Sequence, residues 1–209
     1  TEDGAILITG KGGTGKSSTA LAALARGLRY VGDDYLAVRL TPEPTAHSLY
    51  STAKLNAHDV EVFPSLAPLV RKLPADDGEK AVLHLYPDLA PQIVPAMPLR
   101  AVATPRVLPR KDTGWAPAGA LTLRRAAAFT TLSQLPYAGQ HTQAFIDALI
   151  DRLPGFELQL GADRDGLVDA LRQLLACNDA ELRAKAGRGR THGTAGTAPY
   201  HAAGAADAA

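Results

Sequence analysis

The chain is poor in cysteine. Cys177 is its only cysteine, so no disulfide can form within the chain. The six histidines lack the pairing and the cysteine neighbours that are typical of a zinc site. These absences exclude a disulfide scaffold and favour a reducing compartment, and we expect a cytoplasmic protein.

An excess of charge and long apolar runs are also missing. The 22 basic residues nearly balance the 21 acidic ones, which leaves a formal net charge of +1 without a basic run. This balance disfavours nucleic acid as a partner. No apolar run approaches the roughly 20 residues that span a bilayer, and TEDGAILITG lacks the basic head and apolar body of a signal peptide. We therefore expect a soluble protein that binds neither nucleic acid nor membrane.

The length and composition predict one domain. With 209 residues, 46% of them hydrophobic, the chain can bury one ordinary core, and we expect a single α/β domain over residues 1–183. Residues 184–209 contain ten alanines, five glycines and three threonines, which predicts a disordered, low-complexity tail. The first predicted strand follows Thr1 almost directly, and we expect a fragment that lacks upstream residues.

The N-terminal half predicts a strand, a helix and then short strands. AILIT (5–9) is a short apolar run between an Asp-Gly turn and a glycine cluster, as in a buried strand. Apolar residues at helical spacing predict a helix from Lys16 that ends near Gly27. YLAVRL (35–40) alternates like a strand. Twelve of the fifteen prolines lie in residues 42–117, where we expect strands and loops rather than long helices.

Regular elements are predicted again near the C-terminus. Thr142 is placed to cap a helix that Pro154 and Gly155 would end. FELQLG (156–161) then predicts a strand. Asp163 or Asp165 can cap a last helix, whose apolar face would comprise Leu167, Val168, Leu171, Leu174 and Leu175.

The stretch GKGGTGKS (10–17) matches the phosphate-binding pattern G-x-x-x-x-G-K-[ST] in full, between a predicted strand and a predicted helix. Its glycines allow backbone N–H groups to point inward and form an anion site at the positive end of the helix. Lys16 should reach the terminal phosphates, and the Ser17 hydroxyl should help to coordinate magnesium. We expect a nucleotide site that comprises Gly10, Lys11, Gly12, Gly13, Thr14, Gly15, Lys16, Ser17 and Ser18.

Two adjacent carboxylates, Asp33 and Asp34, follow Lys16 by seventeen and eighteen residues. A helix of eleven residues descends about 17 Å from the phosphates, and five extended residues climb back through about the same height. The carboxylates should therefore arrive beside the phosphates. Because adjacent side chains in extended chain point to opposite faces, one carboxylate can bind the metal while the other accepts a proton from a hydroxyl. The spacing does not assign the two roles.

The residues from Gly10 to Val38 resemble the P-loop region of the HPr kinase/phosphorylase family, in which a Walker A loop is followed by a helix, Arg-Gly and an Asp-Asp pair. They are more similar still to the HPr-kinase-like serine kinases found with peptide-modifying gene clusters, including lasso peptide kinases. That closer similarity extends to SLYSTAKL (48–55) and, more loosely, to PRVLPRKDT, TTLSQLP and LPGFELQLG. The resemblance spans residues 5–175.

This resemblance implies a P-loop fold shared with HPr kinases and phosphoenolpyruvate carboxykinases. It also implies ATP- and Mg²⁺-dependent phosphoryl transfer to a serine of a peptide or small protein, and a homo-oligomer. Gly10, Gly15, Lys16 and Ser17 carry over as the nucleotide and magnesium site, and Asp33 and Asp34 as the metal and base pair. The segment typical of the reverse, phosphorylase reaction is not found. Of the two activities of the family, we therefore expect the kinase activity.

Lys54 is a further candidate for the catalytic site. Its positive charge can neutralise charge on the transferred phosphate. A lone lysine is also commonly a solvated surface residue, and both interpretations stay open.

Two other functions fit parts of the sequence. KGGTGKSS (11–18) also fits the deviant Walker A loop of dimeric ATPases of the partitioning or ion-pump kind, in which Lys11 would be the signature lysine. Such proteins need a downstream apolar strand that ends in an aspartate, whereas Asp112 follows VLPRK. A non-catalytic, nucleotide-gated module that binds a peptide is the other alternative.

Overall fold

The computed structural model describes residues 1–72, 79–134 and 139–187, and these form a mixed α/β structure. The N-terminal elements are β1 (Ala5–Ile8), α1 (Lys16–Ala25), β2 (Leu36–Arg39), β3 (Thr45–Ser48), β4 (Thr52–Asn56), α2 (Ala57–Val60), a 3₁₀ turn η1 (Ala67–Leu69), β5 (Val70–Lys72) and β6 (Lys80–His84). They are followed by β7 (Ala96–Val107), β8 (Gly114–Pro117), α3 (Ala120–Gln134), α4 (Gln140–Arg152), β9 (Gly155–Leu160), α5 (Arg164–Ala176) and α6 (Asp179–Lys185).

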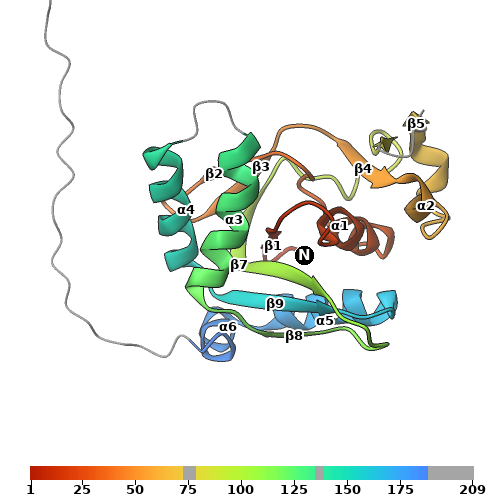
Figure 1. Ribbon diagram of the computed structural model, residues 1–209. Coiled ribbons are helices and arrows are strands. Elements are labelled where there is room, and N and C mark those ends of the chain that lie inside the picture. Colours follow the sequence, from red (N-terminus) through yellow and green to blue (C-terminus); the bar gives the residue numbers. More distant parts are fainter. Residues whose placement is uncertain (73–78, 135–138, 188–209) are drawn as a thin grey trace, which may run out of the picture.

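The larger sheet is built around β7. Its strand order is β2-β3-β7-β9-β8, and β1 also pairs with β7. Both β1 and β9 run parallel to β7, while β3 runs antiparallel to it (Figure 1). Because parallel strands end at the same edge of a sheet, the glycine-rich loop after β1 lies at the edge where ligands bind in open α/β sheets.

The side chains of β1 point alternately to the two sides of this sheet. Ile6 and Ile8 pack in a core that includes α1, α5 and α6. Ala5 and Leu7 pack against a second core, to which α3 and α4 contribute. The strand thus carries an apolar residue at each of its four positions, as expected for a strand with a core on both faces.

A second sheet has the order β4-β6-β5 and covers part of α1. Its inner face carries Ala53, Leu55 and Leu83, all buried in the core that contains α1. Its outer face carries polar residues, because the strands alternate between buried and exposed positions. Figure 1 shows α1 between this small sheet and the pair α3 and α4.

Helix α1 ends as the sequence predicts. Gly27 has a φ of +86°, its N–H donates to the Leu24 carbonyl at 3.0 Å, and the Leu28 N–H donates to the Ala23 carbonyl at 3.0 Å. This pair of bonds is a Schellman motif, which a glycine adopts without steric cost. It turns the chain sharply toward Tyr30 and the aspartates.

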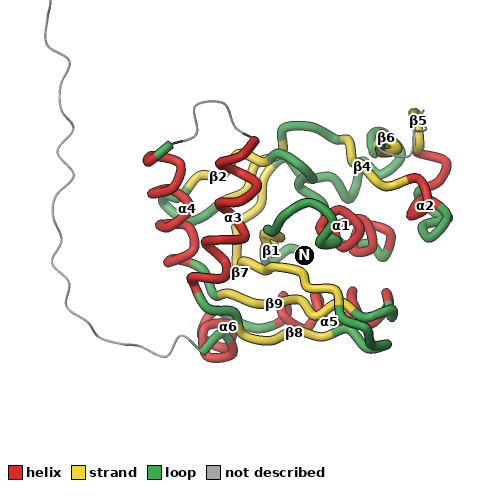
Figure 2. The backbone as a smooth tube through the Cα atoms, in the orientation of Figure 1, coloured by secondary structure: helices red, strands yellow, loops and turns green. Residues whose placement is uncertain are grey.

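Most of the predicted elements are confirmed. The strands predicted at 5–9, 35–40 and 156–161 are present, and their bounds agree with the prediction within one residue at each end. Asp163 caps α5, as predicted, by accepting from the N–H groups of Asp165 and Gly166. The described part of residues 42–117 contains no long helix, as predicted, because α2 and η1 have only four and three residues. Figure 2 shows that strands and loops make up most of this part. None of the helices in the described ranges combines the length and apolar character that crossing a bilayer requires.

Three details of the prediction are wrong. Thr142 does not cap α4, which begins at Gln140 after Gly139, so Thr142 lies inside the first turn. Helix α3 was not expected, because its alanine-rich sequence has no strong apolar stripe. The predicted tail begins too early, since α6 runs to Lys185 and Ala186 is buried. Residues 188–209 of that predicted tail lie outside the described residues.

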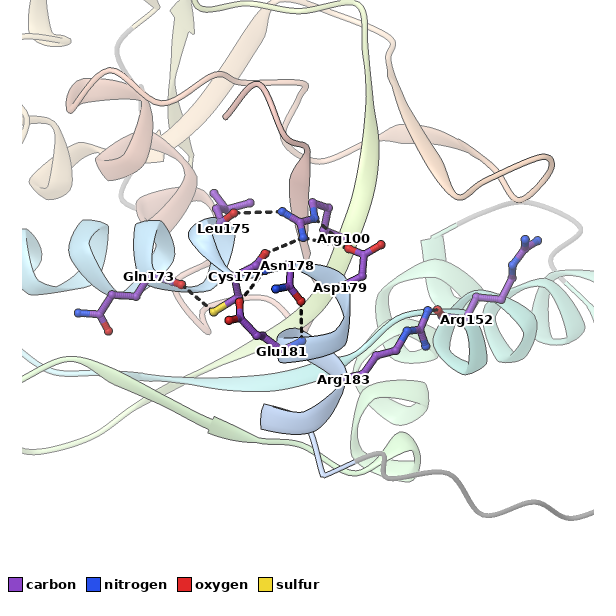
Figure 3. Close-up of polar contacts among 9 residues, drawn as sticks. All are labelled: Arg100, Arg152, Gln173, Leu175, Cys177, Asn178, Asp179, Glu181 and Arg183. Atoms are coloured by element: carbon purple, nitrogen blue, oxygen red, sulfur yellow. Dashed lines mark hydrogen bonds and ion pairs between the residues drawn. The ribbon is translucent and has the colours of Figure 1, made fainter.

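Helix α6 is anchored by local capping and by arginines (Figure 3). Asn178 and Glu181 form a reciprocal capping box at its start. Arg100, on β7, donates to the carbonyls of Leu175 at 3.1 Å and Cys177 at 2.6 Å, and to Asp179 at 2.9 Å. The Arg100 guanidinium therefore satisfies two carbonyl groups at the end of α5 and bonds to a carboxylate at the start of α6. It thereby joins both helices to the sheet.

Arg100→Ala should lower the free energy of unfolding by about 2 kcal/mol, because two carbonyls lose a charged donor. Arg106→Ala, on the same strand, is the matched control, since its side chain is 66% exposed and lies 3.8 Å from Glu157. Such a surface pair contributes less than about 1 kcal/mol. Urea denaturation measures both variants, and equal losses of stability would contradict the anchoring role of Arg100.

Candidate functional site

The loop between β1 and α1 has the shape of an anion cradle. Gly13 and Gly15 have φ values of +80° and +92°, in the left-handed region that favours glycine. A Cβ added at Gly15 would lie 2.9 Å from Leu160 Cδ1, so a side chain there would also have to displace this methyl group of β9. Within the loop, the Thr14 hydroxyl donates to the Lys11 carbonyl at 2.9 Å. The loop therefore presents its backbone at the start of α1, where anions bind favourably.

Lys16 lies across this loop. Its Nζ donates to the Lys11 carbonyl at 2.9 Å. Burial lowers the pKa of Lys16 and the positive charge of Lys80 lowers it further, while Asp34 and Asp33 oppose the shift. Lys16 is thus a half-desolvated cation beside two carboxylates and a second lysine.

Asp33 lies against the loop. The Ser17 hydroxyl donates to Asp33 Oδ1 at 2.9 Å, and the Lys54 backbone N–H donates to Asp33 Oδ2 at 3.1 Å. Burial raises the pKa of Asp33, and the charge of Asp34 adds to this shift, whereas the two hydrogen bonds and Lys80 act against it. The expected proximity of Asp33 to the loop is therefore found.

The route to this position differs from the predicted one. No strand forms over residues 28–32. Tyr30 instead makes one parallel bridge with Ile93, through bonds from the Tyr30 N–H to the Gln92 carbonyl and from the Val94 N–H to the Tyr30 carbonyl. The segment is nevertheless extended enough to bring Asp33 back to the start of α1, which is what the path length required.

Asp34 points to a different environment. Its Oδ2 lies 3.5 Å from Lys54 Nζ, and both side chains are more than a third exposed. Lys54, on the outer face of the small sheet, thus contacts Asp33 through its backbone and Asp34 through its ammonium group. The structure brings Ser17, Lys54 and both aspartates together.

An open cavity of about 1690 Å³ runs along these residues, which exceeds the usual volume of a small-molecule site. Among the predicted nucleotide-site residues, it is lined by Gly12, Gly13, Gly15, Lys16, Ser17 and Ser18. Gly10, Lys11 and Thr14 are not among its lining residues, and Thr14 instead supports the loop through its bond to Lys11. Both aspartates and Lys54 line the cavity as well.

Lys80 also lines the cavity, and the sequence did not identify it. It precedes the alternating stretch AVLH in β6, so its position on the polar face could have been inferred from the period of two. Its pairing with β4 and β5 could not, because local periodicity does not encode which strands pair.

The donor atoms suit a magnesium ion that is held jointly with phosphates. The Ser17 hydroxyl and the Asp33 carboxylate offer two hard oxygen ligands, 2.9 Å apart. No group of three or more acidic, histidine or cysteine side chains that could hold a metal occurs in the described ranges. Magnesium commonly takes only one or two protein ligands and completes its shell with water and substrate phosphates, so these residues fit it.

The chain matches no protein-family model, no curated protein and no solved structure.

Asp33→Asn should not reduce stability at neutral pH in metal-free buffer. Because the pKa of Asp33 is raised in the folded state, the stability that this group contributes is present at acidic pH and is lost as the pH rises through that pKa. The amide can still accept from the Lys54 N–H and donate to the Ser17 hydroxyl. Thermal unfolding should show a Tm at least equal to that of the parent at neutral pH, and the advantage should shrink at acidic pH.

Asp34→Asn is the control, because the Asp34 side chain is exposed and removal of its charge relieves little desolvation. A clear loss of stability at neutral pH in Asp33→Asn alone would contradict the assigned electrostatic cost of Asp33.

Proposed function

We propose that the chain is an ATP- and Mg²⁺-dependent kinase that transfers a phosphoryl group to a serine hydroxyl of a peptide or small protein. The observation that carries this proposal is the contact of Asp33 with Ser17, which joins a carboxylate pair to a complete phosphate-loop sequence. A nucleotide-binding loop alone argues only for binding. A carboxylate pair at its mouth supplies the groups that transfer to a hydroxyl needs.

The nucleotide phosphates would lie in the cradle formed by Gly13, Gly15 and the start of α1. Lys16 would release the Lys11 carbonyl and donate to the terminal phosphates. Ser17 and Asp33 would hold magnesium, which neutralises charge on the phosphates when it is bound. The burial of Asp33 is acceptable in this role, because a cation replaces the water that the carboxylate lacks.

The different surroundings of the two aspartates suggest their roles. Asp33 contacts the expected metal ligand Ser17, whereas Asp34 faces the cavity beside Lys54. We assign Asp34 as the base: it accepts the proton of the serine hydroxyl as the serine oxygen bonds to the γ-phosphorus and the bond to the ADP oxygen breaks. Lys54 would balance charge on the transferred group.

The resemblance of the P-loop region supports the finer parts of this proposal. These are a fold of the HPr kinase and phosphoenolpyruvate carboxykinase type, a single domain, and a cytoplasmic, homo-oligomeric enzyme. The mixed sheet and the position of the loop at its edge are compatible with that fold. An acceptor peptide or small protein, rather than nucleic acid or a membrane, remains the proposed partner.

The strand beside β1 favours the kinase over a dimeric ATPase. Such an ATPase needs an apolar strand that ends in an aspartate, and β7 is the apolar strand that runs parallel to β1. Beyond Ala103, where the pairing with β1 ends, β7 continues with Thr104, Pro105 and Arg106. This strand end supplies a hydroxyl and a guanidinium but no carboxylate.

Labelled ATP incubated with serine-containing peptides should yield phosphopeptides. Asp33→Asn and Asp34→Asn should each reduce the transfer rate by about 100-fold or more, because each removes a group used in the transition state. Only Asp33→Asn should also weaken magnesium-dependent binding of ADP. Asp88→Asn, a change in an exposed turn after β6, is the matched control and should leave the rate unchanged.

Undiminished phosphopeptide yield in both site variants would overturn the mechanism. Nucleotide binding without transfer to any acceptor would instead favour a nucleotide-gated binding module.

The ATPase alternative makes a separate prediction about Lys11, whose side chain is exposed. If the chain is a kinase, Lys11→Ala should leave the sedimentation of the Mg·ATP-bound protein unchanged. ATP-induced dimerisation that is lost in Lys11→Ala, together with ATP hydrolysis and no phosphorylated acceptor, would favour the ATPase.

A further inference from the structure

Lys80 lies on the face of the small sheet that borders the phosphate loop. In the pairing of β4 with β6, Asn56 is opposite Lys80 and Lys54 is opposite Val82. Residues two apart on a strand point to the same side, so Lys80 and Lys54 are diagonal neighbours on one face. Both line the cavity that contains Lys16 and Asp33. Figure 2 shows β6 beside β4, on the far side of α1 from α3 and α4.

The other lysines of this face have acidic partners. Lys54 pairs with Asp34 at 3.5 Å, and Lys72 pairs with Glu79 at 3.3 Å. Lys80 has no ion pair or hydrogen bond through its side chain within the ranges that the structure describes, and the side chain is exposed to the cavity. Its charge is therefore available to a ligand.

Lys80 shares the cavity with the lysine of the phosphate loop. Two ammonium groups, one on α1 and one on β6, therefore border one space. An anion between them would relieve their repulsion and gain from both.

We propose that Lys80 is a second phosphate-binding lysine, which contacts the terminal phosphate of a bound nucleoside triphosphate together with Lys16. This inference rests on the nucleotide site of the proposed function. A triphosphate places one more charged group in the space between the two lysines than a diphosphate does. Lys80 therefore favours the triphosphate over the diphosphate, while the loop itself holds the phosphates that both share.

The test is calorimetric binding of the magnesium complexes of a β,γ-imido ATP analogue and of ADP, which requires no acceptor. Lys80→Gln should weaken binding of the ATP analogue about tenfold, as expected for loss of one charged hydrogen bond, and should change ADP binding less than about twofold. Lys80→Arg should restore most of the affinity for the ATP analogue. Lys72→Gln, on the same sheet but paired with Glu79, is the matched control and should bind both nucleotides like the parent.

Equal affinities of Lys80→Gln and the parent for the ATP analogue would overturn the proposal. An equal loss for both nucleotides would overturn it as well, because Lys80 would then act on the whole site rather than on the terminal phosphate. Failure of the parent to bind either nucleotide would overturn both this inference and the proposed kinase. A selective loss in Lys80→Gln, together with no phosphoryl transfer by the parent, would support Lys80 and reject the kinase.

Discussion

The carboxylate of Asp33 is the link on which the candidate site depends. It accepts one hydrogen bond from the Ser17 hydroxyl at the start of α1 and another from the Lys54 N–H of β4. Three segments far apart in the sequence therefore meet at one side chain. The raised pKa of Asp33 shows that its burial is incompletely compensated, which is typical of groups that are arranged for a ligand rather than for stability.

The same link fixes the small sheet relative to the phosphate loop. Once the backbone of Lys54 is held by Asp33, the register of β4 with β6 sets the position of Lys80 on the same face. The apolar inner face of this sheet packs on the core with α1, and its outer face turns toward the cavity. The packing of the apolar inner face thus positions the charged side chains of the outer face.

The sequence predicts the local elements of the site well and its long-range partners poorly. The length of α1 and the glycine that ends it determine how far the chain must return, so the arrival of Asp33 beside Ser17 follows from path length. The return needs only extended backbone, and this is why the absence of a regular strand at Tyr30 does not change the outcome. Lys80 was missed because its role depends on the pairing of β6 with β4, which lies well before it in the sequence, and local periodicity does not encode that pairing. Helix α3 was missed for a related reason, since its formation owes more to packing on α4 and β7 than to an apolar stripe.

The charges around the loop are unbalanced in favour of positive charge. Lys16, Lys54 and Lys80 face Asp33 and Asp34, so one positive charge is in excess before any ligand binds. The ion pair of Lys54 with Asp34 is exposed and therefore weak, so an incoming phosphate can compete for Lys54 at little cost. A magnesium ion beside Asp33 would add positive charge at the same place and strengthen the preference for a highly charged phosphate. In the proposed kinase reaction, the carboxylate of Asp34 would then lie next to the transferred group, where a base is required, because Lys54 would have turned to the phosphate.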